Sequence, residues 1–187
     1  MTIRLAHVDE LLCIDLEATC WENDEDRRRE TIEIGAVRYR PGAGVIAEHQ
    51  QFVRPVKSPA LSELCTSLTG ITQAQVEASA TFPDALRRLR EFAGGDPVLC
   101  SWSDFDREQL FKDCALHRLD YPFAIHIDVM KLFAGRTGRP YLPQHVVLQA
   151  CGLTPQGRAH SAIDDARNLA QIVDWLVRRE GSTAASS

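Results

Sequence analysis

The feature that most constrains this chain of 187 residues is a short apolar run at positions 11–16 with an aspartate near its end. An apolar run of this length is typical of a strand that is buried on both faces of a sheet. Asp15 lies in the run and Glu17 follows two positions later, so both carboxylates project from one face of an extended backbone. Burying a carboxylate in such a strand is costly unless it is paired or binds a metal ion. The alternative is that the strand ends at Ile14 and that Asp15 caps a loop.

The remaining strand and helix patterns alternate along the chain and indicate its fold class. Apolar or alternating patterns bounded by turn residues predict strands at residues 32–40, 45–53, 97–101 and 124–129. Apolar residues at helical spacing predict helices at residues 82–93, 104–116, 143–150 and 164–179. Early strands joined by short turns, followed by alternating strands and helices, predict an α/β fold with a mixed sheet and helices on both faces.

The length accommodates one domain with one substantial core, and we assign residues 1–180 to it. Small residues dominate positions 181–187, which predicts a flexible tail. The six cysteines are scattered and form no CxxC pair, so we expect reduced thiols rather than a zinc site or a disulfide framework. Since no apolar run approaches the roughly 18 residues of a membrane helix, we expect a cytoplasmic protein that binds no membrane.

The charge of the chain limits the partners that it can bind. With 21 Lys and Arg against 26 Asp and Glu, the net charge is −5. An acidic protein is poorly suited to grip a long duplex through many phosphates, but it can receive a short single-stranded end. If several carboxylates bind divalent cations, the site becomes less negative and can accept a phosphate backbone.

Two further segments supply carboxylates next to predicted helices. Asp104 and Asp106 follow the strand at 97–101, and ligands of open α/β sheets collect beyond the carboxyl ends of the strands. Asp104 has the simpler alternative of capping the helix that follows. His160 lies on a loop before a helix whose first turn carries Asp165. That arrangement suits a histidine that faces a substrate beside a metal-binding carboxylate, although a capped helix would look the same.

Three sequence segments together resemble the motifs of the DEDDh family of 3′-to-5′ exonucleases. They are DLEATCW at 15–21, SWSDFDREQL at 101–110 and HSAIDDARN at 160–168, and EIGAV at 33–37 and SLTGIT at 67–72 also look like family segments. Within the family the chain is most similar to the histone-mRNA 3′-end and small-RNA-trimming exonucleases and their bacterial relatives. The resemblance implies a ribonuclease-H-like fold, with a five-stranded mixed sheet whose second strand is antiparallel to the rest.

The resemblance also implies a catalytic site that binds two Mg²⁺ or Mn²⁺ ions. His160 would be the general base, and the metal ligands would be Asp15, Glu17, Asp106 and Asp165. The second motif departs from the histone-type pattern, in which an aspartate directly follows SW, because this chain has SWSDFD. Asp104 is therefore an alternative ligand, although we favour Asp106.

Several candidate substrate contacts lie beside these motifs. The resemblance places Leu68 of the SLTGIT loop against the terminal base and the backbone near Ala18 at the 3′ hydroxyl. Trp21, Trp102 and Phe105 stand next to motif carboxylates, where an aromatic ring can stack on a base. Packing in the core is the alternative for all three rings.

The predicted function is removal of nucleoside 5′-monophosphates from single-stranded 3′ ends, with RNA favoured over DNA by the likeness to the RNA-trimming group. The alternatives are a DNA exonuclease of proofreading or repair type, a binding module that has lost catalysis, and a metal-dependent phosphatase. The sequence indicates no protein partner and no oligomeric state.

Overall fold

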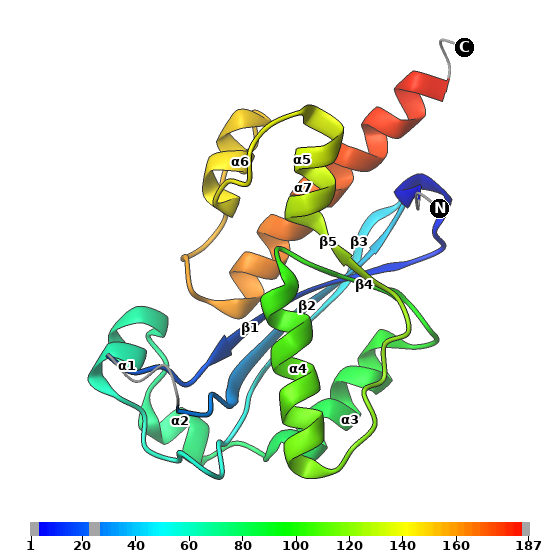
Figure 1. Cartoon of the computed structure of the whole chain (residues 1–187). Coiled ribbons are helices and arrows are strands. Elements are labelled where there is room, and N and C mark those ends of the chain that lie inside the picture. The colour runs from blue at the N-terminus through cyan, green and yellow to red at the C-terminus, as the bar shows by residue number, and fades with distance from the viewer. Residues whose placement is uncertain (1–3, 23–26, 185–187) are drawn as a thin grey trace.

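The computed structural model describes residues 4–22 and 27–184 and contains one mixed sheet (Figure 1). Its strands are β1 (Leu11–Ala18), β2 (Thr31–Arg40), β3 (Gly44–Phe52), β4 (Val98–Ser101) and β5 (His126–Asp128). They lie in the order β3-β2-β1-β4-β5. β2 pairs antiparallel with β1 and β3, whereas β1, β4 and β5 pair parallel. The five-stranded sheet with an antiparallel second strand is confirmed.

Helices cover both faces of the sheet, as the strand and helix patterns predicted. Figure 1 shows α5 (Val129–Thr137), α6 (Gln144–Ala150) and α7 (Ala162–Ala184) on one side of the sheet, and α3 (Phe82–Ala93) and α4 (Asp104–His117) on the other. Leu11 and Cys13 of β1 pack in the core under α7, while Leu12 and Ile14 pack in the core under α3 and α4. Both faces of β1 are therefore buried, which explains why its sequence is continuously apolar.

Three segments differ from the sequence prediction. The stretch around SLTGIT, predicted as a loop, contains α1 (Glu63–Thr69) and α2 (Gln73–Glu77), which lie beyond the end of β1 (Figure 1). The strand predicted at 124–129 is limited to β5, and it is followed by α5, for which no helix was predicted. Asp128 caps α5 by accepting a hydrogen bond from the Lys131 amide at 2.8 Å. α7 begins two residues early and continues to Ala184, past the predicted start of the tail, and residues 185–187 lie outside the described part.

No helix in the described ranges is both long enough and apolar enough to cross a membrane.

A short 3-10 helix at Leu5–His7 precedes β1, and its backbone is fastened to α7. The amides of Leu5 and Ala6 donate to the carboxylate of Glu180 at 3.1 and 2.8 Å. The two ends of the described chain therefore lie on the same side of the molecule, away from the carboxyl end of β1 (Figure 1).

Candidate active site

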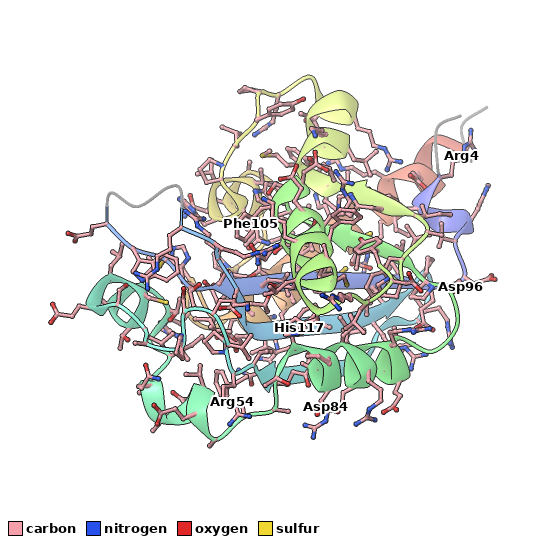
Figure 2. All side chains as sticks on the ribbon, turned by 60° about the horizontal axis from the view of Figure 1, so that its bottom comes forward. Arg4, Arg54, Asp84, Asp96, Phe105 and His117 are labelled. Atoms are coloured by element: carbon pink, nitrogen blue, oxygen red, sulfur yellow. The ribbon has the colours of Figure 1, made fainter. Side chains whose placement is uncertain are left out.

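A cleft of about 630 Å³ lies at the carboxyl end of β1. Three separate segments contribute its acidic residues: β1, the first turn of α4, and the loop and first turn at the start of α7. Phe105 and His117 mark the two ends of α4 in Figure 2, and the Phe105 end reaches the cleft. The five predicted catalytic residues all line this cleft, namely Asp15, Glu17, Asp106, His160 and Asp165.

Three of the carboxylates form a tight cluster. Asp15, Glu17 and Asp165 each offer an oxygen, and these oxygens lie within 4.8 Å of one another. Asp15 and Glu17 share a face of β1 because one residue separates them in the strand. Asp165 comes from the first turn of α7, which is far from β1 in sequence. Its position in the cluster therefore depends on how α7 packs on the sheet.

Gly35 on β2 allows that packing. It pairs with Asp15 across the β1–β2 ladder. A Cβ atom at Gly35 would lie 2.1 Å from the carbonyl carbon of Ala162, the first residue of α7. Only a glycine permits so close an approach of helix to strand. The neighbouring Glu33 accepts a hydrogen bond from the Ala162 amide at 3.1 Å, which holds the helix start against β2.

The structure places Asp106 in the cleft and Asp104 outside its lining. Asp106 is only 4% exposed, and its Oδ1 accepts a hydrogen bond from the Leu16 amide of β1 at 3.0 Å. Asp104 forms ion pairs with Lys131 and Arg107 instead. Ser103 caps α4 by accepting from the Phe105 amide at 3.3 Å, so Asp104 is the first residue of the helix and Asp106 the third.

His160 is held beside Asp165 by its own backbone. Its amide donates to Asp165 Oδ2 at 2.9 Å. With φ at 59°, His160 adopts the left-handed conformation, which costs a non-glycine residue about 1 kcal/mol. The ring is carried on an exposed turn that faces the cleft. The hydrogen bond to Asp165 therefore offsets the cost of the left-handed backbone at His160.

The electrostatics of the cleft disfavour four ionised carboxylates. Burial raises the pKa of Asp15 well above its ordinary value, and the charges of Asp106, Asp165 and Glu17 raise it further. Burial, followed by the neighbouring acids, raises the pKa of Glu17 to about 8. Burial raises the pKa of Asp106 to about 7 although the Leu16 amide opposes the shift. These acids need a compensating positive charge to be fully ionised at neutral pH.

Four of the five predicted substrate contacts line the cleft. Phe105 and Leu68 are 39% and 41% exposed, and Ala18 and Trp102 form neighbouring parts of the wall. Trp102 also packs against the core under α7. Trp21 is not among the lining residues, and its ring lies under the guanidinium of Arg27, 4.2 Å from the ring centroid.

Sequence reasoning missed several residues of the cleft and its supports. Glu33 is an acid inside an apolar strand, which is the same signal that singled out Asp15, yet it received no role. For the others the sequence carries no comparable signal, because they reach the cleft only through folding. These other residues that line the cleft are Cys20, Gln144, His145 and Gln156.

Comparisons with known proteins agree with this geometry. The sequence profile of the exonuclease family matches residues 12–173. The 3′-5′ exoribonuclease 1 of Rattus norvegicus is 34% identical over 181 residues, which cover 89% of this chain and 52% of that protein. The chain therefore spans about half the length of this relative.

Two solved structures are similar over the whole domain. The nuclease domain of 3′hExo, a DEDDh family member bound to rAMP, matches with a TM-score of 0.87 at 30% identity, over 92% of this chain and 94% of that one. A 3′-exonuclease that recognises the histone mRNA stem-loop matches with a TM-score of 0.85 at 30% identity, over 92% of this chain and 65% of that one. The resemblance inferred from the three motifs is confirmed, and the chain belongs to the DEDDh group of the exonuclease family.

Proposed function

We propose that this chain is a divalent-metal-dependent exonuclease that removes nucleoside 5′-monophosphates from single-stranded 3′ ends, with RNA as the favoured polymer. The observation that carries the proposal is the meeting of Asp15, Glu17, Asp106 and Asp165 in one cleft from three separate segments. The match to a nuclease domain bound to rAMP supports a nucleotide as the occupant and RNA as the polymer.

The donor set fits hard divalent cations. The clustered ligand atoms are all carboxylate oxygens, which suit Mg²⁺ or Mn²⁺, and two such ions would be held by the four acids. Burial raises the pKa of Asp15, Glu17 and Asp106, so a cation is needed to keep them ionised at neutral pH. When bound, the ions would supply an activated water and offset charge on the leaving 3′ oxygen.

The residues of the chain then have distinct tasks. His160 would take a proton from the attacking water, because an imidazole can act as a base at neutral pH. Asp165 positions His160 through the bond from the His160 amide. The Leu16 amide fixes the carboxylate of Asp106 by donating to its Oδ1. These contacts orient the carboxylates and the base before substrate arrives, and the Leu16–Asp106 bond also joins β1 to α4.

The walls of the cleft would hold the terminal nucleoside. Leu68 and Phe105 expose apolar side chains that can pack against a base, which is worth roughly 1 to 3 kcal/mol for an aromatic ring. The backbone at Ala18 lies next to Glu17 in the same cleft, where it can meet a 3′ hydroxyl. Trp102, which is partly exposed, extends the apolar wall.

The proposal is tested by digesting a 5′-labelled single-stranded RNA and the DNA of the same sequence with Mg²⁺, with Mn²⁺ or with chelator. We expect a metal-dependent ladder that shortens from the 3′ end, faster on RNA, with nucleoside 5′-monophosphates as products. No shortening of either polymer with any metal would overturn the exonuclease function. Release of inorganic phosphate alone would indicate a phosphatase, and faster digestion of DNA would overturn the preference for RNA.

A further inference from the structure

The loop that carries His160 is fastened to α7 at several points besides His160 itself. Asn168 clamps Gln156 in both directions, because its side chain accepts from the Gln156 amide at 2.8 Å and donates to the Gln156 carbonyl at 3.0 Å. Asp164 accepts from the Arg158 amide at 3.0 Å. The backbone of this loop is therefore held by side chains of α7, whereas the side chain of Arg158 contacts a different element.

The Arg158 guanidinium reaches α1, whose Leu68 also lines the cleft. It donates a hydrogen bond to the carbonyl of Thr69, the last residue of that helix. Carbonyls at the end of a helix have no partner within it and carry partial negative charge, so a guanidinium is well suited to bind there. Because α1 has only seven residues, one bond at its end restrains a large part of the helix relative to the loop that carries Arg158.

Gly70 provides the room for this contact. It ends α1 in the left-handed conformation with φ at 66°. A Cβ atom at Gly70 would lie 2.9 Å from both terminal nitrogens of Arg158. The glycine thus satisfies two requirements, since the helix end needs a positive φ and the arginine needs space.

The two segments that Arg158 joins both line the cleft. α1 contributes Leu68, and the loop contributes His160. Arg158 also lies close enough to the acids for its charge to oppose the raised pKa of Glu17 and of Glu33. Its side chain therefore lies near the carboxylate cluster as it bridges the two segments.

We propose that Arg158 is a positioning residue that couples the wall receiving the terminal nucleoside to the loop carrying the general base, so that the two segments move as one body. The inference rests on the proposed exonuclease function for its catalytic consequence. Its structural part, the coupling of α1 to the loop, stands on the contacts of Arg158 with Thr69 and Gly70.

The test compares the parent with Arg158→Ala, Arg158→Lys, Gly70→Ala and the double variant Arg158→Ala with Gly70→Ala. Arg87→Ala is the matched control, because Arg87 is an exposed arginine on α3 that pairs with Asp84 and Glu91. Hydrogen exchange of the metal-free proteins is followed at residues 66–71 and 156–161. Calorimetry measures Mn²⁺ affinity, and kcat and KM are measured on RNA at a temperature at which every variant is folded.

We expect Arg158→Ala to speed exchange at both segments together and to lower kcat/KM about tenfold, as for loss of a charged hydrogen bond. Mn²⁺ affinity should stay the same or rise, because a positive charge near Glu17 is removed. Arg158→Lys keeps one donor and should recover part of kcat. Gly70→Ala strains the left-handed end of α1 and also displaces Arg158. The part of its effect that passes through Arg158 should therefore disappear in the Arg158→Ala background, whereas the backbone strain should remain. Arg87→Ala should change none of these quantities.

Unchanged exchange in Arg158→Ala would overturn the proposal, and so would strictly additive effects of the two substitutions. A rise in KM alone, with normal exchange, would show that Arg158 binds substrate phosphate directly and also overturns it. If the parent does not digest RNA, the proposed function fails, while the exchange measurement still decides whether Arg158 couples the two segments.

Discussion

Glu17 and Glu30 are both buried glutamates near the junction of β1 and β2, yet the protein surrounds them in opposite ways. Glu30 is 3% exposed and accepts hydrogen bonds from the amides of Val56, Lys57 and Ser58 at 2.7 to 2.8 Å. Glu17 is 8% exposed, and burial and the neighbouring acids raise its pKa to about 8. One carboxylate is satisfied by backbone donors and ties a loop to the sheet. The other lies in a cluster of like charges.

This difference separates structural acids from candidate metal ligands. Desolvation is unfavourable for both, but only the Glu30 environment offsets it within the protein. Asp104 and Asp106 repeat the contrast within a single helical turn. The ammonium of Lys131 lowers the pKa of Asp104, whereas burial raises the pKa of Asp106 to about 7. Burial alone does not identify a metal ligand, but burial among like charges, with too few donors and cations to offset them, does indicate one.

The largest effect is expected at Asp106. Asp106→Asn should lower the rate of RNA digestion about a thousandfold, because a proposed metal ligand is replaced by a neutral group in a site that would stabilise developing charge. Asp104→Asn, which removes an ion pair with Lys131 outside the cleft, should change the rate less than about twofold. Initial rates on 5′-labelled RNA measure both. Equal losses in the two variants would remove the distinction drawn between these aspartates.

His160→Ala should lower kcat by about a hundredfold or more, the usual contribution of a general base. Because the histidine is not one of the carboxylates, Mn²⁺ affinity measured by calorimetry should stay within about twofold of the parent. Loss of metal binding in this variant would instead assign His160 to the metal site. His145→Ala is the control, since His145 lines the same cleft without a hydrogen bond to Asp165 in the described structure.

Glu30→Gln should destabilise the metal-free protein by about 2 kcal/mol, because charge-assisted hydrogen bonds to three amides are weakened. Glu17→Gln should leave the free energy of unfolding unchanged or raise it, because it removes a charge from an acidic cluster. Urea unfolding in the presence of chelator measures both. A larger loss in Glu17→Gln than in Glu30→Gln would contradict the comparison.

The smallest effect is a pH dependence of stability. The folded-state pKa values of Glu17 and Asp106, about 8 and about 7, lie above those of the unfolded chain. Their contribution to stability is therefore fully present below the unfolded pKa and is lost as pH rises through the folded values. In chelator the melting temperature should fall as pH rises from about 5 to about 8, and saturating Mg²⁺ should reduce the fall. A fall that Mg²⁺ leaves unchanged would place its cause outside the cleft.

Local sequence patterns were sufficient for most of the fold. The apolar run of β1, the helical spacing in α3, α4 and α7, and their order along the chain predicted the sheet and its covering helices. α1, α2 and α5 were missed because helices of seven, five and nine residues show little periodicity. The capping box between Thr72 and Gln75 was the one readable signal for α2.

The sequence by itself determined which residues could take part in chemistry, because acids next to apolar strands and before helices are local features. The motif resemblance already favoured Asp106 over Asp104, but only the tertiary structure shows which of them reaches β1. Two positions in a helix point about 200° apart, and the packing of α4 turns Asp106 toward β1. The tertiary structure also sets the close approach of α7 to β2 at Gly35 and the contact of Arg158 with α1. These contacts join segments far apart in the chain, and long-range packing rather than local propensity brings such segments together.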